Sequence, residues 1–228
     1  MMPQDPAANG PTDKFDYRKS VQKTEDKFIF QFLRIDKYVN RPLASLIVRA
    51  VYKTGVTPNQ LTLMAFALGL AGAYSFSRGT PSAFLVGGLL AQASSIMDNA
   101  DGMLARARNQ MSEFGAQLDL YLDRVNEFFL LICVALGQFR YSGSLKLLIV
   151  GLAATAIYFL QVSLFYLTKN FTRDFQKGET GEVRSWLMFL VFLCGALNRL
   201  EYGLYFFFVL GAGIVLVHSL SFLRKPKS

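Results

Sequence analysis

Long apolar stretches constrain this chain more than any other feature of its sequence. Six of them follow one another, with approximate limits at residues 61–78, 81–105, 115–138, 144–168, 185–199 and 202–223. An α-helix rises about 1.5 Å per residue, so about 20 apolar residues cover the ~30 Å hydrocarbon core of a bilayer. The fifth stretch is short, and its helix is expected to begin earlier or to tilt. The sequence therefore predicts an all-α integral membrane protein with six transmembrane helices.

The composition agrees with a membrane protein, because 52% of the 228 residues are hydrophobic and 21 are Phe. The formal net charge of +8 does not indicate nucleic acid, since the basic residues flank apolar runs instead of forming one patch. They favour contact with an anionic leaflet and with phosphate-bearing substrates. Both cysteines, Cys133 and Cys194, lie inside apolar runs. We interpret them as small core residues and not as a disulfide or metal site.

The chain before the first stretch divides into two parts. Residues 1–13 are rich in Pro, Gly and small polar residues and are expected to be disordered, and no signal peptide is recognisable there. Residues 14–56 are expected to form a cytoplasmic and interfacial region. Within it, residues 41–54 are amphipathic with basic ends, which predicts a helix lying on the cytoplasmic face of the membrane. Residues 57–224 then form the six-helix membrane domain.

The distribution of basic residues predicts the topology. The N-terminal region, Arg106 and Arg108, the 169–184 connection and the basic C-terminal end all fall on one side of the predicted helices. The positive-inside rule places that side in the cytoplasm. An even number of spans then puts both termini inside, with the protein in the cell (inner) membrane.

The stretch from Asp98 to Asp123 combines acidic residues, two glycines and two arginines between two apolar runs. Asp98 and Asp101 are three residues apart, and Asp119 and Asp123 are four apart, so each pair lies on one face of a helix. A helical hairpin that turns near residues 109–113 would bring the two pairs together at one level. Four oxygen ligands without a nearby His or Cys suit a hard divalent cation, and Mg²⁺ completed by water and phosphate oxygens is expected.

The alternative explanation is a solvated acidic face, which is the usual meaning of a single pair of acids at helical spacing. The apolar flanks argue against it here, because ionisable groups at the ends of membrane helices are costly and indicate function. Four neighbouring carboxylates would also repel one another, and a metal relieves that repulsion. We therefore predict a metal site that opens to the cytoplasm.

The same stretch resembles the CDP-alcohol phosphotransferase family, whose signature is D-x2-D-G-x2-A-R-x8-G-x3-D-x3-D. All spacings are met here, by Asp98, Asp101, Gly102, Ala105, Arg106, Gly115, Asp119 and Asp123. The resemblance extends over roughly residues 40 to 224. It implies a membrane transferase that moves a substituted phosphate from a CDP-alcohol, such as a CDP-diacylglycerol-like donor, to a hydroxyl acceptor and releases CMP.

The resemblance also implies roles for the acidic residues. Asp98, Asp101, Asp119 and Asp123 would hold two Mg²⁺ ions, with Mn²⁺ as a substitute. Asp123 would in addition be the general base that accepts the proton of the acceptor hydroxyl, since a hydroxyl is a poor nucleophile.

Nucleotide contacts are assigned by the same resemblance. Gly102 would let the nucleotide approach the backbone, Arg106 would bind a phosphate, and Ser112 matches a polar position near the nucleotide. The segment VTPNQLT is, from its residues alone, a helix start with Pro58 in the first turn. Family members often carry a P-N-x-[LI]-[ST] element there, which makes Pro58, Asn59 and Thr62 candidates for cytidine or pyrophosphate contact.

The acceptor is indicated less directly. The segment DLYLDRVNEFF resembles members that use inositol phosphate more than phosphatidylglycerophosphate synthases, which tend to have D-P-x-x-D-K. Lys169, Arg173 and Arg184 lie in or beside the basic connection. They either only set topology or bind a phosphate on the acceptor, with Arg184 the preferred candidate.

Two other classes of protein are alternatives. A Mg²⁺-dependent prenyltransferase also uses acidic clusters, but those are usually D-D-x-x-D, and the trailing D-x3-D is foreign to them. A transporter or channel could line an ion path with acids, but acids gathered at one end of two helices do not form a through-path. The expected partners are the CDP-linked donor, the acceptor, membrane lipids and a second copy of the chain in a homodimer, with no nucleic acid.

Overall fold

The computed structural model describes the backbone of residues 36–171 and 179–223, and side chains over 36–164 and 185–216. The expectations for residues 1–13 and for most of the basic connection, including Arg173, lie outside the described residues. Lys169 and Arg184 belong to helices whose backbone is described, while their side chains lie outside the description.

The described chain is helical, as predicted. A short π-helical turn, η1 (Asp36–Asn40), leads into α2 (Arg41–Val51). The longer helices follow, and their bounds are α3 (Pro58–Ser77), α4 (Pro81–Ala107), α5 (Glu113–Ser142), α6 (Leu145–Phe171), α7 (Glu179–Ala196) and α8 (Leu200–Leu223). The fifth predicted span, which looked short, begins at Glu179 and not at residue 185, so the expected earlier start is confirmed.

The membrane-crossing capacity of the helices is uneven. Pro58–Ser77 and Leu145–Leu164 are long and apolar enough to cross a bilayer by length and composition, and Ser185–Ala196 and Leu200–Leu216 are shorter apolar segments. The α4 and α5 helices instead mix apolar residues with the acidic stretch. The count of six spans and the interfacial placement of α2 therefore stay predictions.

Hydroxyl side chains begin the three helices around the acidic stretch. Thr57 caps α3 by accepting from the Gln60 amide, and the side-chain oxygen of Gln60 accepts from the Thr57 amide. Thr80 caps α4, and Ser112 caps α5 through the Gly115 amide at 3.0 Å. These caps satisfy N–H groups that have no partner within the helix, so the sequence itself fixes where each helix starts.

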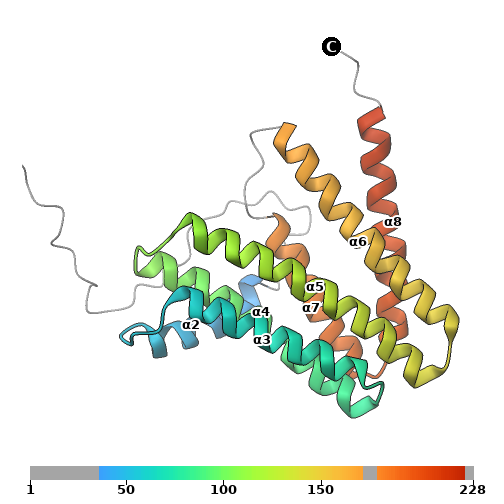
Figure 1. Ribbon diagram of the computed structural model, residues 1–228, viewed down its shortest axis with the longest axis horizontal. Coiled ribbons are helices and arrows are strands. Elements are labelled where there is room, and N and C mark those ends of the chain that lie inside the picture. The colour runs from blue at the N-terminus through green and yellow to red at the C-terminus, as the bar shows by residue number, and fades with distance from the viewer. Residues whose placement is uncertain (1–35, 172–178, 224–228) are drawn as a thin grey trace, which may run out of the picture.

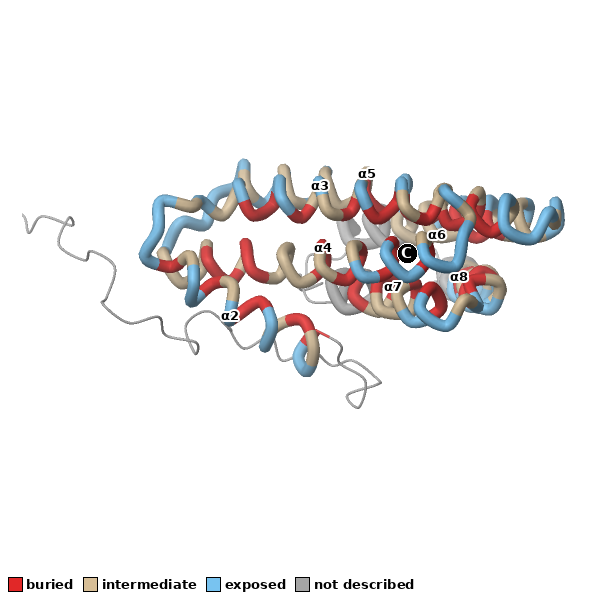
Figure 2. The backbone as a smooth tube through the Cα atoms, turned by 90° about the horizontal axis from the view of Figure 1, so that it is seen from below, coloured by how far each residue is buried: buried red, intermediate tan, exposed pale blue. Residues whose placement is uncertain are grey.

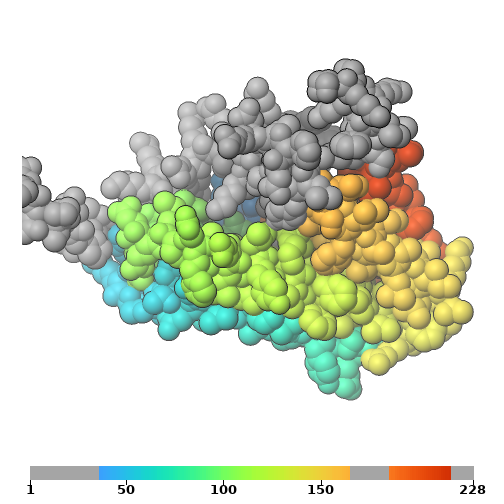
Figure 3. Space-filling model, turned by 45° about the horizontal axis from the view of Figure 1, so that its top comes forward, coloured from blue at the N-terminus to red at the C-terminus, as the bar shows by residue number. Residues whose placement is uncertain are grey.

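The helices are arranged in two layers (Figures 1 and 2). One layer contains α3 and α5, and the other contains α4 and α7, with α2 packed against α4. The α6 and α8 helices pack on each other, and α6 also contacts α5. In the space-filling view α5 crosses one face of the molecule, with α3 along one edge and α6 beyond it (Figure 3).

Two hydrophobic clusters hold these layers together. The larger one joins α3, α4, α5, α7 and α8, and includes Phe76, Phe84 and Leu187. The smaller one joins α2, the start of α3 and the C-terminal part of α4, and includes Val48 and Met103. Along α4 the change from one cluster to the other falls between Ala91 and Ile96, just before the acidic stretch, so apolar packing supports α4 on both sides of that point.

Candidate functional site

Three carboxylates from α4 and α5 converge. Asp98 from α4 and Asp119 and Asp123 from α5 each offer one oxygen, and these oxygens all lie within 4.8 Å of one another. The hairpin expected from the spacing is therefore present, because α4 ends at Ala107, α5 begins at Glu113, and their acidic faces meet.

The chemistry of this donor set fits a hard divalent cation. The Oδ1 atoms of Asp98 and Asp119 are buried, and all three side chains are half-buried. Like charges at this separation in a partly buried place repel strongly, and a cation between them converts repulsion into attraction. All three ligands are carboxylates, which suit Mg²⁺, Ca²⁺ or Mn²⁺ better than a soft metal.

The fourth carboxylate, Asp101, lies outside this group of three. It is 6% exposed, and its Oδ2 accepts a hydrogen bond of 2.5 Å from the Thr62 hydroxyl of α3. Thr62 is thus bonded to a predicted metal ligand, and its contact with the nucleotide stays a prediction. Asp101 as a ligand stays a prediction, and Thr62 orients its carboxylate.

Gly102 and Arg106 lie together one turn further along α4. A Cβ atom on Gly102 would come within 3.2 Å of Nη1 of Arg106, so the guanidinium lies over the glycine. The two residues that were predicted to contact the nucleotide thus form one small surface, in which the missing side chain leaves room for the guanidinium or a ligand.

The starts of α3 and α5 meet beside Gly115. A Cβ atom there would lie 3.0 Å from the Ser112 hydroxyl and 3.1 Å from Oδ1 of Asn59. Pro58, at the first position of α3, accepts a bond of 3.2 Å from the Thr62 hydroxyl through its carbonyl. Four residues that were predicted to contact the nucleotide, Pro58, Asn59, Thr62 and Ser112, thus lie at the same end of the bundle as the carboxylates.

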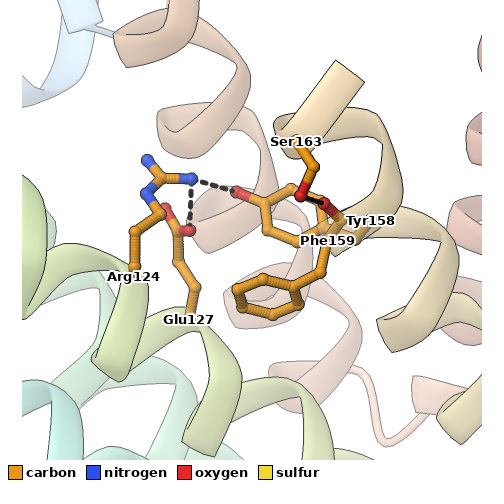
Figure 4. Close-up of polar contacts among 5 residues, drawn as sticks. All are labelled: Arg124, Glu127, Tyr158, Phe159 and Ser163. Atoms are coloured by element: carbon orange, nitrogen blue, oxygen red, sulfur yellow. Dashed lines mark hydrogen bonds and ion pairs between the residues drawn. The ribbon is translucent and has the colours of Figure 1, made fainter. Parts of the chain in front are cut away.

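A buried ion pair follows directly after Asp123 and was missed by the sequence reasoning. Nη1 of Arg124 lies 2.7 Å from Oε2 of Glu127, which is 0% exposed, and donates to the Tyr158 hydroxyl of α6 at 3.3 Å (Figure 4). The signal was present, because Asp119, Asp123 and Glu127 repeat every four residues on one stripe of an apolar helix. The network ties α6 to α5 one turn beyond the carboxylates.

A second polar network lies on the opposite side of α4. The Asp36 carboxylate accepts hydrogen bonds from Asn40, from Asn99 of α4 and from Ser185 of α7. Asn40 is also bonded to Ser95, at 3.1 Å. Because Asn99 lies between Asp98 and Asp101 in the sequence, this network holds the helix that carries these carboxylates.

A cavity among the described residues lies away from the carboxylates. A space of about 490 Å³ opens at the far end of α5, lined by residues that include Gln138, Tyr141, Asn198 and Glu201. Its polar groups bond to one another, as Asn198 does to Tyr141 at 2.9 Å and Gln138 to Glu201 at 3.4 Å. We place the chemistry at the carboxylates, because charge of one sign gathers there.

A family model described as CDP-alcohol phosphatidyltransferase matches residues 55–219. A bifunctional IPC transferase and DIPP synthase of Archaeoglobus fulgidus is 39% identical over 102 residues, which is 45% of this chain and 20% of that protein. An archaetidylinositol phosphate synthase of Pyrococcus horikoshii is 34% identical over 104 residues, covering 46% of this chain and 53% of that protein. The inner membrane protein YnjF of Escherichia coli is 39% identical over 83 residues, or 36% and 38% of the two chains. The matches thus span between a fifth and about half of these relatives' lengths.

Proposed function

This chain belongs to the CDP-alcohol phosphatidyltransferase family, and from that premise we propose that it transfers a substituted phosphate from a CDP-alcohol to a hydroxyl acceptor, releasing CMP. The observation that carries the proposal is the convergence of Asp98, Asp119 and Asp123 within 4.8 Å, inside a complete family signature. Neither a prenyltransferase nor a channel accounts for both the signature and the family match.

The site residues have separate roles in the proposed transfer. Asp98, Asp101, Asp119 and Asp123 would hold two Mg²⁺ ions, which when bound neutralise charge on the donor pyrophosphate. Asp123 accepts the proton of the acceptor hydroxyl. The acceptor oxygen then forms a bond to the phosphorus that carries the donor's alcohol, and the bond from that phosphorus to the CMP oxygen breaks. Arg106, lying over Gly102, binds a phosphate of the donor.

The proposed acceptor is an inositol phosphate. Two of the relatives support this choice through their names, one as an archaetidylinositol phosphate synthase and one as an IPC transferase and DIPP synthase. Lys169, Arg173 and Arg184 are proposed to bind the acceptor's phosphate, with Arg184 the principal contact because a guanidinium binds phosphate with two parallel hydrogen bonds. The alternative is a different head-group acceptor, such as glycerol phosphate.

We also propose the arrangement in the membrane. Six spans follow from the apolar stretches, and the distribution of basic residues supports both termini and the carboxylates on the cytoplasmic side. The α2 helix would lie in the interface, since it buries Ala44 and Val48 against α4 and exposes Leu43 and Leu46. A homodimer in the cell (inner) membrane completes the proposal.

The test is a transfer assay on the purified full chain. CDP-diacylglycerol, a CDP-linked diether lipid and a soluble CDP-alcohol are each offered with inositol phosphate, glycerol phosphate or free inositol, and CMP and labelled product are measured. We expect transfer to inositol phosphate that EDTA abolishes and Mg²⁺ restores. Full transfer in chelated buffer would contradict the metal site, and no CMP from any pair would contradict the function.

A further inference from the structure

Arg106 and Arg108 lie at the C-terminal end of α4 and contact different partners. Arg106 lies over Gly102 at the candidate site. Arg108, at the C-cap of the same helix, donates instead to main-chain carbonyls of the connection between α2 and α3. Its guanidinium reaches Val51 at 2.7 Å, Tyr52 at 2.6 and 3.1 Å, Thr54 at 2.8 Å and Val56 at 2.5 Å.

Arg108 adds to the local hydrogen bonds of this segment. The Val51 carbonyl accepts from the Thr54 amide at 3.0 Å and from the Thr54 hydroxyl at 2.8 Å, and the connection after Val51 lacks regular structure. A guanidinium presents several N–H groups in one plane on a fixed fork, so one side chain can serve acceptors spread over six residues. Its cation also lies 5.9 Å from the centre of the Tyr52 ring. A lysine could satisfy only part of this set.

The connection that Arg108 holds leads directly into the nucleotide side of the proposed site. It ends at Thr57, the cap of α3, and the next turn carries Asn59, beside Gly115, and Thr62, bonded to Asp101. The capping box between Thr57 and Gln60 is local to α3 and does not attach that helix to its neighbours.

Besides the bond from Thr62 to Asp101, two sets of contacts dock the start of α3 on α4. The first is the smaller hydrophobic cluster, in which Leu61 packs with Met103 and Leu104. The second is the set of bonds from Arg108, which lies at the polar edge of that cluster. Apolar packing is non-directional and does not by itself set the height of Asn59 relative to the carboxylates, whereas directed bonds to four carbonyls between residues 51 and 56 do.

We propose that Arg108 is a positioning residue for the donor: by holding the α2–α3 connection it places Asn59 and Thr62 against the cytidine nucleotide, without touching the nucleotide itself. This rests on the proposed function, and it assigns the two arginines separate tasks. Arg106 binds the anionic donor, and Arg108 donates its hydrogen bonds to main-chain carbonyls. Binding of the acceptor is not expected to depend on Arg108.

The test compares Arg108→Ala and Arg108→Lys with Arg78→Ala in the full chain. Arg78 is the matched control, because it is the C-cap of α3 and donates to Tyr74 of its own helix at the opposite end. The KM of the CDP donor is measured at saturating acceptor, and the KM of the acceptor at saturating donor. We expect Arg108→Ala to raise the donor KM roughly 10- to 100-fold, the size of effect that a small misplacement causes, with the acceptor KM within about 2-fold. Arg108→Lys should recover part of the loss, and Arg78→Ala should change neither constant.

Amide hydrogen exchange supplies a readout independent of turnover. Residues 52–57 should exchange faster in both Arg108 variants, and CMP with Mg²⁺ should protect residues 59–62 less than in the wild type. If Arg108→Ala does not fold, Arg108→Lys keeps the positive charge near the helix end and carries the same comparison.

Three results would overturn the inference. They are an unchanged donor KM in the lysine variant, an equal loss for donor and acceptor, and unchanged exchange over residues 52–57. Wild-type protein that releases no CMP would contradict the proposed function separately. Binding of CMP with Mg²⁺ then becomes the comparison, and the absence of binding, or equal affinity in wild type and Arg108→Lys, would end the proposal as well.

Discussion

The connection between α3 and α4 and the connection between α4 and α5 are built alike but do different things. Each begins with an arginine at a helix C-cap, Arg78 or Arg108, and each ends with a hydroxyl N-cap, Thr80 or Ser112. At the first connection Arg78 bonds within its own helix. At the second, Arg108 holds another segment of the chain, and Ser112 lies beside Gly115.

The difference lies in what surrounds the two connections. The α4–α5 connection faces α2 and the start of α3, and three carboxylates converge on the hairpin that it closes. At the opposite end the polar residues pair with one another, as Arg199 does with Glu201 at 3.6 Å. Local capping rules therefore explain both turns. Long-range polar contacts occur at both ends, so the candidate functional end is distinguished by its gathered charge of one sign.

The largest expected effect comes from removing one carboxylate charge at the functional end. Asp98→Asn, Asp101→Asn and Asp119→Asn should each lower turnover by about 10³-fold or more, because a bound metal supplies several kcal/mol of charge stabilisation. Glu201→Gln, at the other end, should leave turnover nearly unchanged. All four variants should insert and purify normally, and CMP release measures the effect. Near-wild-type turnover in the three Asn variants would make these acids a solvated face.

A smaller effect is expected when the hydrogen bond to Asp101 is removed. Thr62→Val keeps the shape but deletes the donor to a buried carboxylate, and a hydrogen bond to a charged group contributes about 1.5–3 kcal/mol. We expect kcat/KM to fall at least about 10-fold and more Mg²⁺ to be needed for half-maximal rate. Thr155→Val is the control, since Thr155 is also buried and donates to its own helix, at Gly151. Equal losses in both variants would point to folding damage.

The smallest effect separates the two caps. Ser112→Ala and Thr80→Ala should each cost about 1 kcal/mol of stability, because each leaves a helix-start amide without its acceptor. Melting in detergent should therefore shift by a similar few degrees in both. Only Ser112→Ala should also lower kcat/KM, by a few-fold, since only that cap adjoins Asn59. A matching loss of activity in Thr80→Ala would remove the distinction between the two connections.

Much of the fold can be predicted from the sequence, because helix positions and starts depend on residues that are close together in the chain. Apolar stretches gave the helices, and Pro58, with Thr57 before it, marked the start of α3. The spacing of Asp98, Asp119 and Asp123 predicted that they would meet, since a short turn between two helices leaves few other arrangements.

The missed features depend on contacts between distant parts of the chain. Nothing near Arg108 in the sequence indicates that its partners lie more than 50 residues earlier. The positive-inside rule alone accounts for a basic residue at this position. Likewise, the sequence does not indicate the bond from Thr62 to Asp101, because that bond exists only after α3 has packed on α4. The contact of Thr62 with the nucleotide stays a prediction. Arg124 and Glu127 gave a readable signal, but their partner Tyr158 lies on another helix.

The order of synthesis along the chain matters for the hydrogen-bond network around Asp36. Asp36 is synthesised before each of its described donors, Asn40, Asn99 and Ser185. Each donor on the back of α4 and at the start of α7 therefore emerges from the ribosome when its acceptor already exists. When Asn99 or Ser185 is packed into the fold, its hydrogen-bond acceptor Asp36 is therefore already part of the chain. Translation from N- to C-terminus thus presents the Asp36 acceptor before every one of these donors on α4 and α7.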